Sequence, residues 1–183
     1  MVRRTFWGSL CIFLILAVLI FPANGEDDPF QRLKIQMMRD KKIAPEFILT
    51  GLNGSQIALK NLKGRVILLS FWATWCGPCK EELPSFEAIH RRFTGNELTV
   101  LTVAVDEEGA IPVKKFLSSY NYTFQILTDS KSKVLDLYGV ERIPTTFLID
   151  KRGRIVGKAL GPRNWKSPEA ISLFNRLIAG AEK

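Results

Sequence analysis

One uninterrupted apolar run constrains the fold of this chain more than any other feature. From Arg65 to Trp72 the sequence reads RVILLSFW, and apolar side chains do not alternate with polar ones. A strand of this kind is buried on both faces, as in a sheet that is covered by helices. The run therefore predicts a domain that contains both helices and strands, with this strand inside the sheet.

The segments around this run alternate between helical and extended patterns. Asn53-Gly54 predicts the turn of a β-hairpin between residues 46–49 and 55–58. Downstream we expect, in order, a helix over 79–93, a strand over 98–105, a helix over 112–120 opened by Pro112, a strand over 124–128, a helix over 132–138, strands over 146–150 and 154–160, and a last helix from Ser167-Pro168 to about Ala179. This order predicts an α/β fold with a central mixed sheet, helices on both faces and an N-terminal β-hairpin extension.

The first 25 residues have the layout of a secretory signal peptide. Arg3 and Arg4 precede an apolar run from Leu10 to Phe21, and small residues follow at Ala23 and Gly25. The run is shorter than the roughly 20 apolar residues of a membrane-spanning helix. We expect cleavage between Gly25 and Glu26 and a periplasmic or other extracytoplasmic location. An uncleaved leader that anchors the protein to the inner membrane is the alternative, and only then would the protein contact the membrane.

Residues 26–42 read as a polar connector before a domain that spans 43–183. Asp28 is suited to cap a short helix with Pro29 at its first position. Phe30, Leu33 and Met37 fall at helical spacing. We interpret this segment as a tether or as a helix that packs loosely on the domain.

Charge does not indicate a nucleic-acid partner. The chain has 26 Lys and Arg against 18 Asp and Glu. The basic residues are scattered, and no basic stripe with interleaved aromatic residues is present. We therefore interpret the positive surplus as a solubility feature and expect no nucleic-acid binding.

Cysteine usage points to redox chemistry. One of the three cysteines, Cys11, lies inside the leader, which leaves Cys76 and Cys79. A structural disulfide stabilises most when it closes a long loop, and two intervening residues close almost none. A structural zinc site needs four ligands, and beyond the leader the chain has two cysteines and one histidine, His90. We therefore expect a redox-active Cys76–Cys79 disulfide with no metal and no cofactor.

The position of the pair explains how it would react. Cys76, Gly77, Pro78 and Cys79 join a buried strand to a helix. Free N–H groups and the helix dipole favour a thiolate at a helix N-terminus, so we expect a lowered pKa at Cys76. Thiolate is the nucleophile of disulfide exchange. Cys76 is the predicted nucleophile, Cys79 is the predicted resolving thiol, and Pro78 stiffens the loop between them.

Several motifs resemble those of the thioredoxin family, in particular its exported TlpA/ResA-like branch. They are Ala44-Pro45-Glu46-Phe47, Leu52-Asn53-Gly54, Leu62-Lys63-Gly64, FWATWCGPCKEELP from Phe71 to Pro84, and Ile143-Pro144-Thr145. The resemblance implies a thioredoxin-like fold and a cis-proline at Pro144 beside the cysteines. It also implies that the backbone of Ile143 pairs with substrate. Trp75 is expected to shield the sulfurs and contact substrate, whereas Trp72 and Trp165 are expected to pack in the interior.

The chain departs from cytosolic thioredoxins at Ser70, where they carry a buried, proton-transferring aspartate. ResA-like proteins have a glutamate three residues after the second cysteine, which corresponds here to Glu82. That spacing places Glu82 on the same helix face as Cys79. We predict that Glu82 is catalytic and tunes the thiols. The alternative is a solvated helix glutamate like its neighbour Glu81.

We expect thiol–disulfide exchange with exported protein thiols and disulfides. The resemblance implies that the enzyme acts as a reductant, supplied by a membrane thiol–disulfide electron donor, and that apocytochrome c is a possible substrate. Two alternatives share this fold: a peroxiredoxin-type peroxidase and a Sco-like copper metallochaperone. The first normally surrounds its cysteine with threonine and arginine. The second normally has three residues between its cysteines and a distant histidine.

Overall fold

Strand β4 (Val66–Trp72) lies at the centre of the sheet in a computed structural model, which describes residues 28–93, 95 and 97–180. It pairs in parallel with β5 (Leu98–Ala104) and antiparallel with β7 (Thr145–Ile149). All seven residues of β4 are buried. The prediction of a strand covered on both faces is confirmed.

The described strands form one mixed sheet in the order β1-β8-β7-β4-β5-β6-β2-β3. The flanking strands are β1 (Gln36–Met37), β8 (Ile155–Leu160), β6 (Gln125–Thr128), β2 (Ile48–Gly51) and β3 (Gln56–Ala58). Strand β5 also pairs in parallel with β6, whereas β7 pairs antiparallel with β8. The expected hairpin around Asn53-Gly54 is present as β2 and β3, and β2 joins it to β6.

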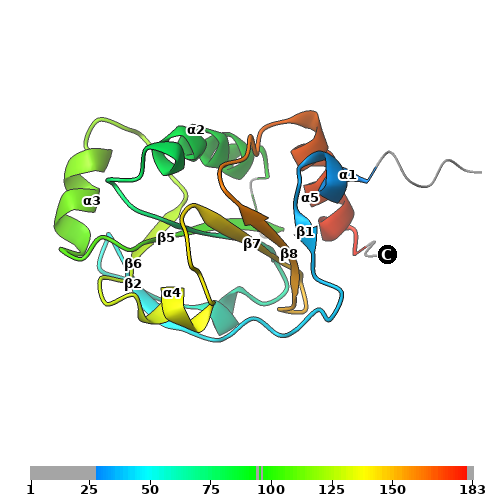
Figure 1. Ribbon diagram of the computed structural model, residues 1–183, viewed down its shortest axis with the longest axis horizontal. Helices are drawn as coiled ribbons and strands as arrows, with labels where there is room; N and C mark the ends of the chain where they lie inside the picture. The colour runs from blue at the N-terminus through cyan, green and yellow to red at the C-terminus, as the bar shows by residue number, and fades with distance from the viewer. Residues whose placement is uncertain (1–27, 94, 96, 181–183) are drawn as a thin grey trace, which may run out of the picture.

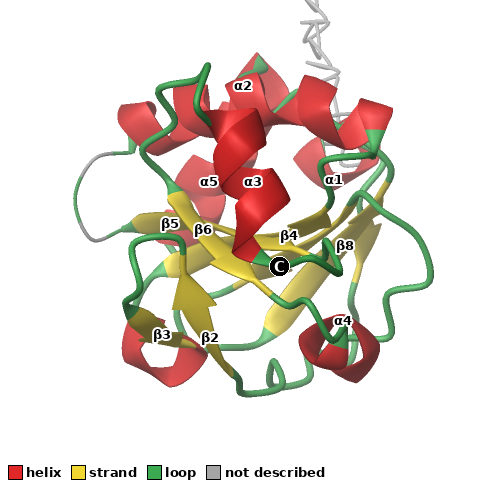
Figure 2. Cartoon of the chain, turned by 90° about the vertical axis from the view of Figure 1, so that its left-hand side faces the viewer, coloured by secondary structure: helices red, strands yellow, loops and turns green. Residues whose placement is uncertain are grey.

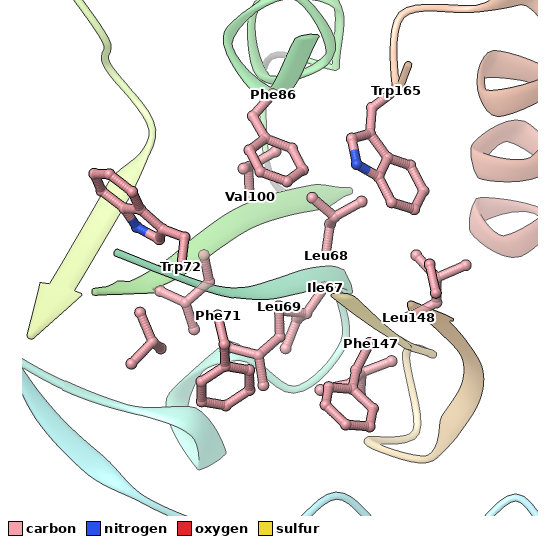
Figure 3. Packing of buried hydrophobic residues seen from close by; sticks show 14 of the residues in the cluster. Ile67, Leu68, Leu69, Phe71, Trp72, Phe86, Val100, Phe147, Leu148 and Trp165 are labelled. Atoms are coloured by element: carbon pink, nitrogen blue, oxygen red, sulfur yellow. The ribbon is translucent and has the colours of Figure 1, made fainter. Parts of the chain in front are cut away.

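Helices cover both faces of this sheet (Figures 1 and 2). Helix α2 (Gly77–Arg92) lies above it in Figure 1, as does α5 (Pro168–Ile178), and α4 (Lys133–Leu137) lies below it. Figure 3 shows the same division in the core, with Phe86 and Trp165 on one side of β4 and Phe71 and Phe147 on the other. A short 3-10 helix, η1 (Leu59–Leu62), follows β3.

Two helices begin earlier than expected. Helix α3 spans Ala110–Leu117, so Pro112 lies inside its first turn and does not open it. Its N-cap is Gly109, whose φ of 70° favours glycine. Helix α2 begins at Gly77 because Cys76 provides the cap.

The segment expected to be a loosely packed helix or tether is part of the packed domain from residue 28 onward. Helix α1 (Pro29–Arg32) is capped by Asp28 as predicted but ends after four residues, and Met37 lies in β1 instead of on the same helix. Phe30 and Ile35 are each only 5% exposed. A Cβ added at Gly157 in β8 would be 2.9 Å from a carbon of each of these two side chains. This side of β8 is therefore closed by the N-terminal segment.

The predicted leader lies outside the described residues, as does its cleavage site. Among residues 28–93, 95 and 97–180, no helix combines the length and apolar character needed to cross a membrane.

Replacing Phe30 with Ala tests the packing of this segment. We expect the free energy of unfolding to fall by about 3–4 kcal/mol, because a buried aromatic ring is removed and a cavity remains. Met37→Ala is the matched control, since Met37 is 38% exposed and we expect a loss below about 1 kcal/mol. Denaturant unfolding measures both variants, and equal small losses would show that the segment is a loose tether.

Candidate active site

The two cysteines lie where β4 passes into α2. Strands β4 and β5 are parallel, so the loops that follow their carboxyl ends meet at one edge of the sheet. The loop after β4 carries Ala73, Thr74 and Trp75 to Cys76, and α2 begins at the next residue. The buried strand therefore fixes the base from which the cysteine loop extends.

Cys76 is the N-cap residue of α2. Its sulfur accepts a hydrogen bond from the backbone N–H of Cys79 at 3.3 Å, where a serine or aspartate oxygen usually serves. A disulfide joins Cys76 and Cys79. Cys76 is 7% exposed and Cys79 is 1% exposed. The nucleophile assignment remains a prediction, but Cys76 has both features it requires: greater exposure than Cys79 and a helix N–H that donates to its sulfur.

Asp106 holds the loop before Cys76, and sequence reasoning did not identify it. This buried residue follows β5, and its carboxylate accepts hydrogen bonds from the Thr74 backbone N–H at 3.1 and 3.2 Å and from the Thr74 hydroxyl. An acidic residue directly after a buried parallel strand is the signal that would have found it. Asp106 therefore positions the redox loop without contacting sulfur in the described structure.

A groove is lined in part by the cysteine loop and by the loop that carries Pro144. The Ile143–Pro144 peptide bond is cis, as the resemblance implies. Trp75 and Ile143, which directly precede Cys76 and Pro144, both line a cavity of about 610 Å³. Trp75 is 70% exposed. The other lining residues are Val105, Glu107, Glu108, Ser132, Leu135, Val140, Glu141 and Arg142. An extended polypeptide fits such a groove better than a small enclosed ligand does.

At the position of the thioredoxin aspartate, the chain has a neutral hydroxyl pair. The Thr146 hydroxyl donates to the Ser70 hydroxyl oxygen at 2.9 Å, and both residues are fully buried. Neither group is an acid in the physiological range. Any carboxylate that moves protons at this site must therefore come from elsewhere.

Glu82, three residues after Cys79 on α2, is a second buried carboxyl besides Asp106. It is 2% exposed, whereas Glu81 is exposed, so the interpretation of Glu82 as a solvated helix residue is wrong. Its Oε1 accepts from the Trp165 ring N–H at 2.6 Å and from the Arg163 backbone N–H at 3.0 Å. Its Oε2 is buried and has no hydrogen-bond partner in the described part of the chain. Burial raises the pKa of Glu82 from 4.5 to about 7, and these two donors and the Arg163 charge only partly oppose that rise.

Trp165 does more than the predicted packing. Its ring stacks on Phe86 with centroids 6.2 Å apart, and its N–H also binds Glu82. Trp72 packs as expected, buried with its ring 5.9 Å from that of Phe116. His90 lies on α2. Over the described residues, no three His, Cys, Asp or Glu side chains form a cluster suited to a metal ion.

Comparison with known proteins gives consistent similarities. The AhpC/TSA family model matches residues 41–158. The thiol-disulfide oxidoreductase ResA of Bacillus thuringiensis is 37% identical over 126 residues, which cover 69% of this chain and 72% of ResA. StoA from Bacillus subtilis is 30% identical with a TM-score of 0.61, over 73% of this chain and 96% of StoA. The exposed lipoprotein thioredoxin Etrx1 from Streptococcus pneumoniae is 29% identical with a TM-score of 0.62, over 73% of this chain and 100% of Etrx1.

Alkylation of the reduced protein tests the predicted roles of the cysteines. Near neutral pH we expect iodoacetamide to label Cys76 at least about tenfold faster than Cys79, because a helix N-terminus stabilises its thiolate and it is more exposed. Mass spectrometry of quenched samples measures the order of labelling. Cys79→Ala should retain fast labelling and Cys76→Ala should lose it. Faster labelling at Cys79 would reverse the assignment.

The burial of Glu82 predicts a pH-dependent stability. The folded carboxyl keeps its proton to about pH 7, whereas the unfolded carboxyl releases it near 4.5, so the free energy of unfolding falls as the pH rises between these values. Glu82→Gln cannot ionise and retains an oxygen that accepts both hydrogen bonds. We expect it to match the wild type below pH 4.5 and to be more stable by about 2–3 kcal/mol above pH 7. Denaturant unfolding across pH measures this, with the exposed Glu81→Gln as a control that should show no such gain.

Proposed function

Because this chain belongs to the AhpC/TSA family and is a thiol–disulfide oxidoreductase of the ResA and StoA type, we propose that it uses Cys76 and Cys79 to reduce disulfides in exported proteins. The observation that carries the proposal is the open groove bordered by Trp75 and Ile143, the residues next to Cys76 and Pro144. A groove lined by the residues that directly precede Cys76 and Pro144 suits a polypeptide substrate.

The reaction follows from the positions of the two sulfurs. The Cys76 thiolate attacks one sulfur of a substrate disulfide, which forms a mixed disulfide and releases the other substrate sulfur as a thiolate. Cys79, deprotonated, then attacks Cys76, which releases the second substrate thiol and forms the Cys76–Cys79 disulfide. Two electrons pass to the substrate in this cycle. The backbone of Ile143 is proposed to align the substrate strand across from Cys76.

Glu82 supports the reducing direction. A buried carboxyl one helical turn from Cys79 ionises near neutral pH and disfavours a second negative charge close by. This destabilises the thiolate state relative to the disulfide. A dithiol whose reduced form is destabilised gives up electrons more readily. The neutral Ser70–Thr146 pair leaves this role to Glu82.

The proposal also covers the location of the protein, its electron donor and its substrate. The leader before Glu26 supports an extracytoplasmic location, and the pneumococcal relative is named as an exposed lipoprotein. Outside the cytoplasm, the disulfide must be reduced again by another dithiol, for which we propose a membrane thiol–disulfide donor. Apocytochrome c, with its pair of haem-binding cysteines, is the proposed substrate within the exported class.

Trapping tests this proposal. Cys79→Ala attacks but lacks the resolving thiol, so we expect stable mixed disulfides through Cys76 with exported proteins, apocytochrome c among them. The variant is expressed in the native host, and captured proteins are identified after release with reductant. Cys76→Ala/Cys79→Ala is the control. Capture of cytoplasmic proteins alone, or of none, would overturn the proposal.

A peroxide assay separates the peroxidase alternative. The dithiol-reduced wild type should consume hydrogen peroxide no faster than the double-cysteine control, and it should reduce insulin disulfides with dithiothreitol. The reverse pattern, fast peroxide consumption with no insulin reduction, would favour a peroxidase.

A further inference from the structure

Arg163 connects the N-terminal segment to the carboxyl of Glu82, which lies three residues after Cys79 on α2. Its Nε donates to the Leu33 carbonyl, 130 positions earlier in the sequence, and its Nη2 donates to the Lys34 carbonyl at 2.9 Å. Its backbone N–H donates to Glu82 Oε1 at 3.0 Å. One residue thus links the beginning of the described chain to the helix that carries Cys79.

From this geometry we propose that Arg163 is a positioning residue that couples the docking of residues 33–34 to the proton chemistry of Glu82 and, through Glu82, to the reactivity of the dithiol. The inference rests on the proposed exchange chemistry of Cys76 and Cys79. It adds a role for the N-terminal segment, which contributes neither a cysteine nor a groove residue.

The guanidinium of Arg163 acts as a clamp: its hydrogen bonds hold the loop between β8 and α5, in which Arg163 lies. Besides Leu33 and Lys34, it donates from Nη1 to the carbonyls of Gly161 at 3.2 Å and Pro162 at 2.9 Å. All four acceptors are backbone carbonyls. Five N–H donors in a rigid plane suit such a set of acceptors, and the single ammonium of lysine cannot reproduce it. The loop after β8 is therefore held between its own carbonyls and those of the N-terminal segment.

This clamp aims two donors at one oxygen. The Arg163 backbone N–H and the Trp165 ring N–H converge on Glu82 Oε1, and the Trp165 backbone N–H is held at 3.2 Å from the Ser85 hydroxyl on α2. Glu82 Oε2 remains buried and unpartnered among the described residues. The ionised carboxyl therefore depends on donors that the loop supplies, and a displaced loop would leave a buried carboxylate without them.

Besides Glu82 itself, three charged residues line the hollow on this face. Glu81, Arg163 and Lys166 line the same hollow of about 370 Å³ on this face, and Cys79 is the titratable group one turn earlier on α2. The Arg163 charge opposes the burial that raises the pKa of Glu82. Loss of the clamp removes both this charge and the aimed N–H donors, so Glu82 should keep its proton to higher pH.

The test measures alkylation rates of the reduced full chain across pH in Arg163→Gln. A neutral Glu82 no longer disfavours a thiolate at the dithiol. We therefore expect the dithiol of Arg163→Gln to be alkylated about threefold faster than that of the wild type near pH 7.5. A direct effect of Arg163 on the sulfurs has the opposite sign, because removing a positive charge disfavours a thiolate. Slower or unchanged alkylation would overturn the proposal.

Two further variants separate coupling from general loosening. Arg176→Gln removes the contacts of Arg176 with Asp28 and the Phe30 ring, which hold α1. It leaves in place the bonds from Arg163 to residues 33–34 and the donors to Glu82. Its alkylation profile should match the wild type. In a Glu82→Gln background, Arg163→Gln should produce no further acceleration. Equal acceleration by Arg176→Gln, or acceleration without Glu82, would overturn the coupling.

Folding and the proposed function are checked separately. If Arg163→Gln unfolds, Arg163→Lys keeps the charge with fewer donors and should give a smaller acceleration of the same sign. A shift of the opposite sign would contradict the proposal. Alkylation needs no protein substrate, so an incorrect substrate assignment would appear only in the trapping experiment and would leave this result unaffected.

Discussion

Burial of β4 on both faces and hydrogen bonding along both of its edges fix the redox site in space. The strand pairs with β5 on one side and β7 on the other, and each of its residues is buried. Its end therefore cannot shift without disturbing the centre of the sheet. The loop that leaves this end delivers Cys76 to the start of α2, and the loop that precedes β7 delivers Pro144 to the same edge. Two segments about 70 residues apart meet there because both are attached to one rigid element.

Two buried carboxyl groups serve this site in different ways. Asp106 accepts three hydrogen bonds from two donors of Thr74, the backbone N–H and the hydroxyl, and these bonds hold the loop before Cys76. Glu82 receives two donors on one oxygen and none on the other within the described chain, so it is held in place but only partly compensated for its burial. A fully bonded carboxylate suits a structural role, whereas a partly bonded one is suited to exchanging a proton.

Local signals in the sequence were enough to predict most of the architecture. The apolar run at β4, the Asn53-Gly54 turn and the helix after Cys76 depend on neighbouring residues, and the structure contains each of them. The role of residues 28–38 was not predictable in this way. Met37 has helical spacing from Phe30, but the pairing of β1 with β8 depends on residues more than 100 positions away. The same holds for the site: the cysteine motif is local, whereas Asp106 and Arg163 reach it only through the tertiary fold.

The two outer strands of the sheet have a consequence for self-association. An exposed sheet edge offers unpaired N–H and C=O groups on which another chain can add a strand, and proteins limit this hazard with short edge strands. Strands β1 and β3, at opposite ends of the sheet, have only two and three residues. Neither edge presents a long ladder. For a protein that is proposed to act on exported polypeptides with exposed cysteines, short edges reduce the opportunity for such chains to nucleate intermolecular β-structure on its surface.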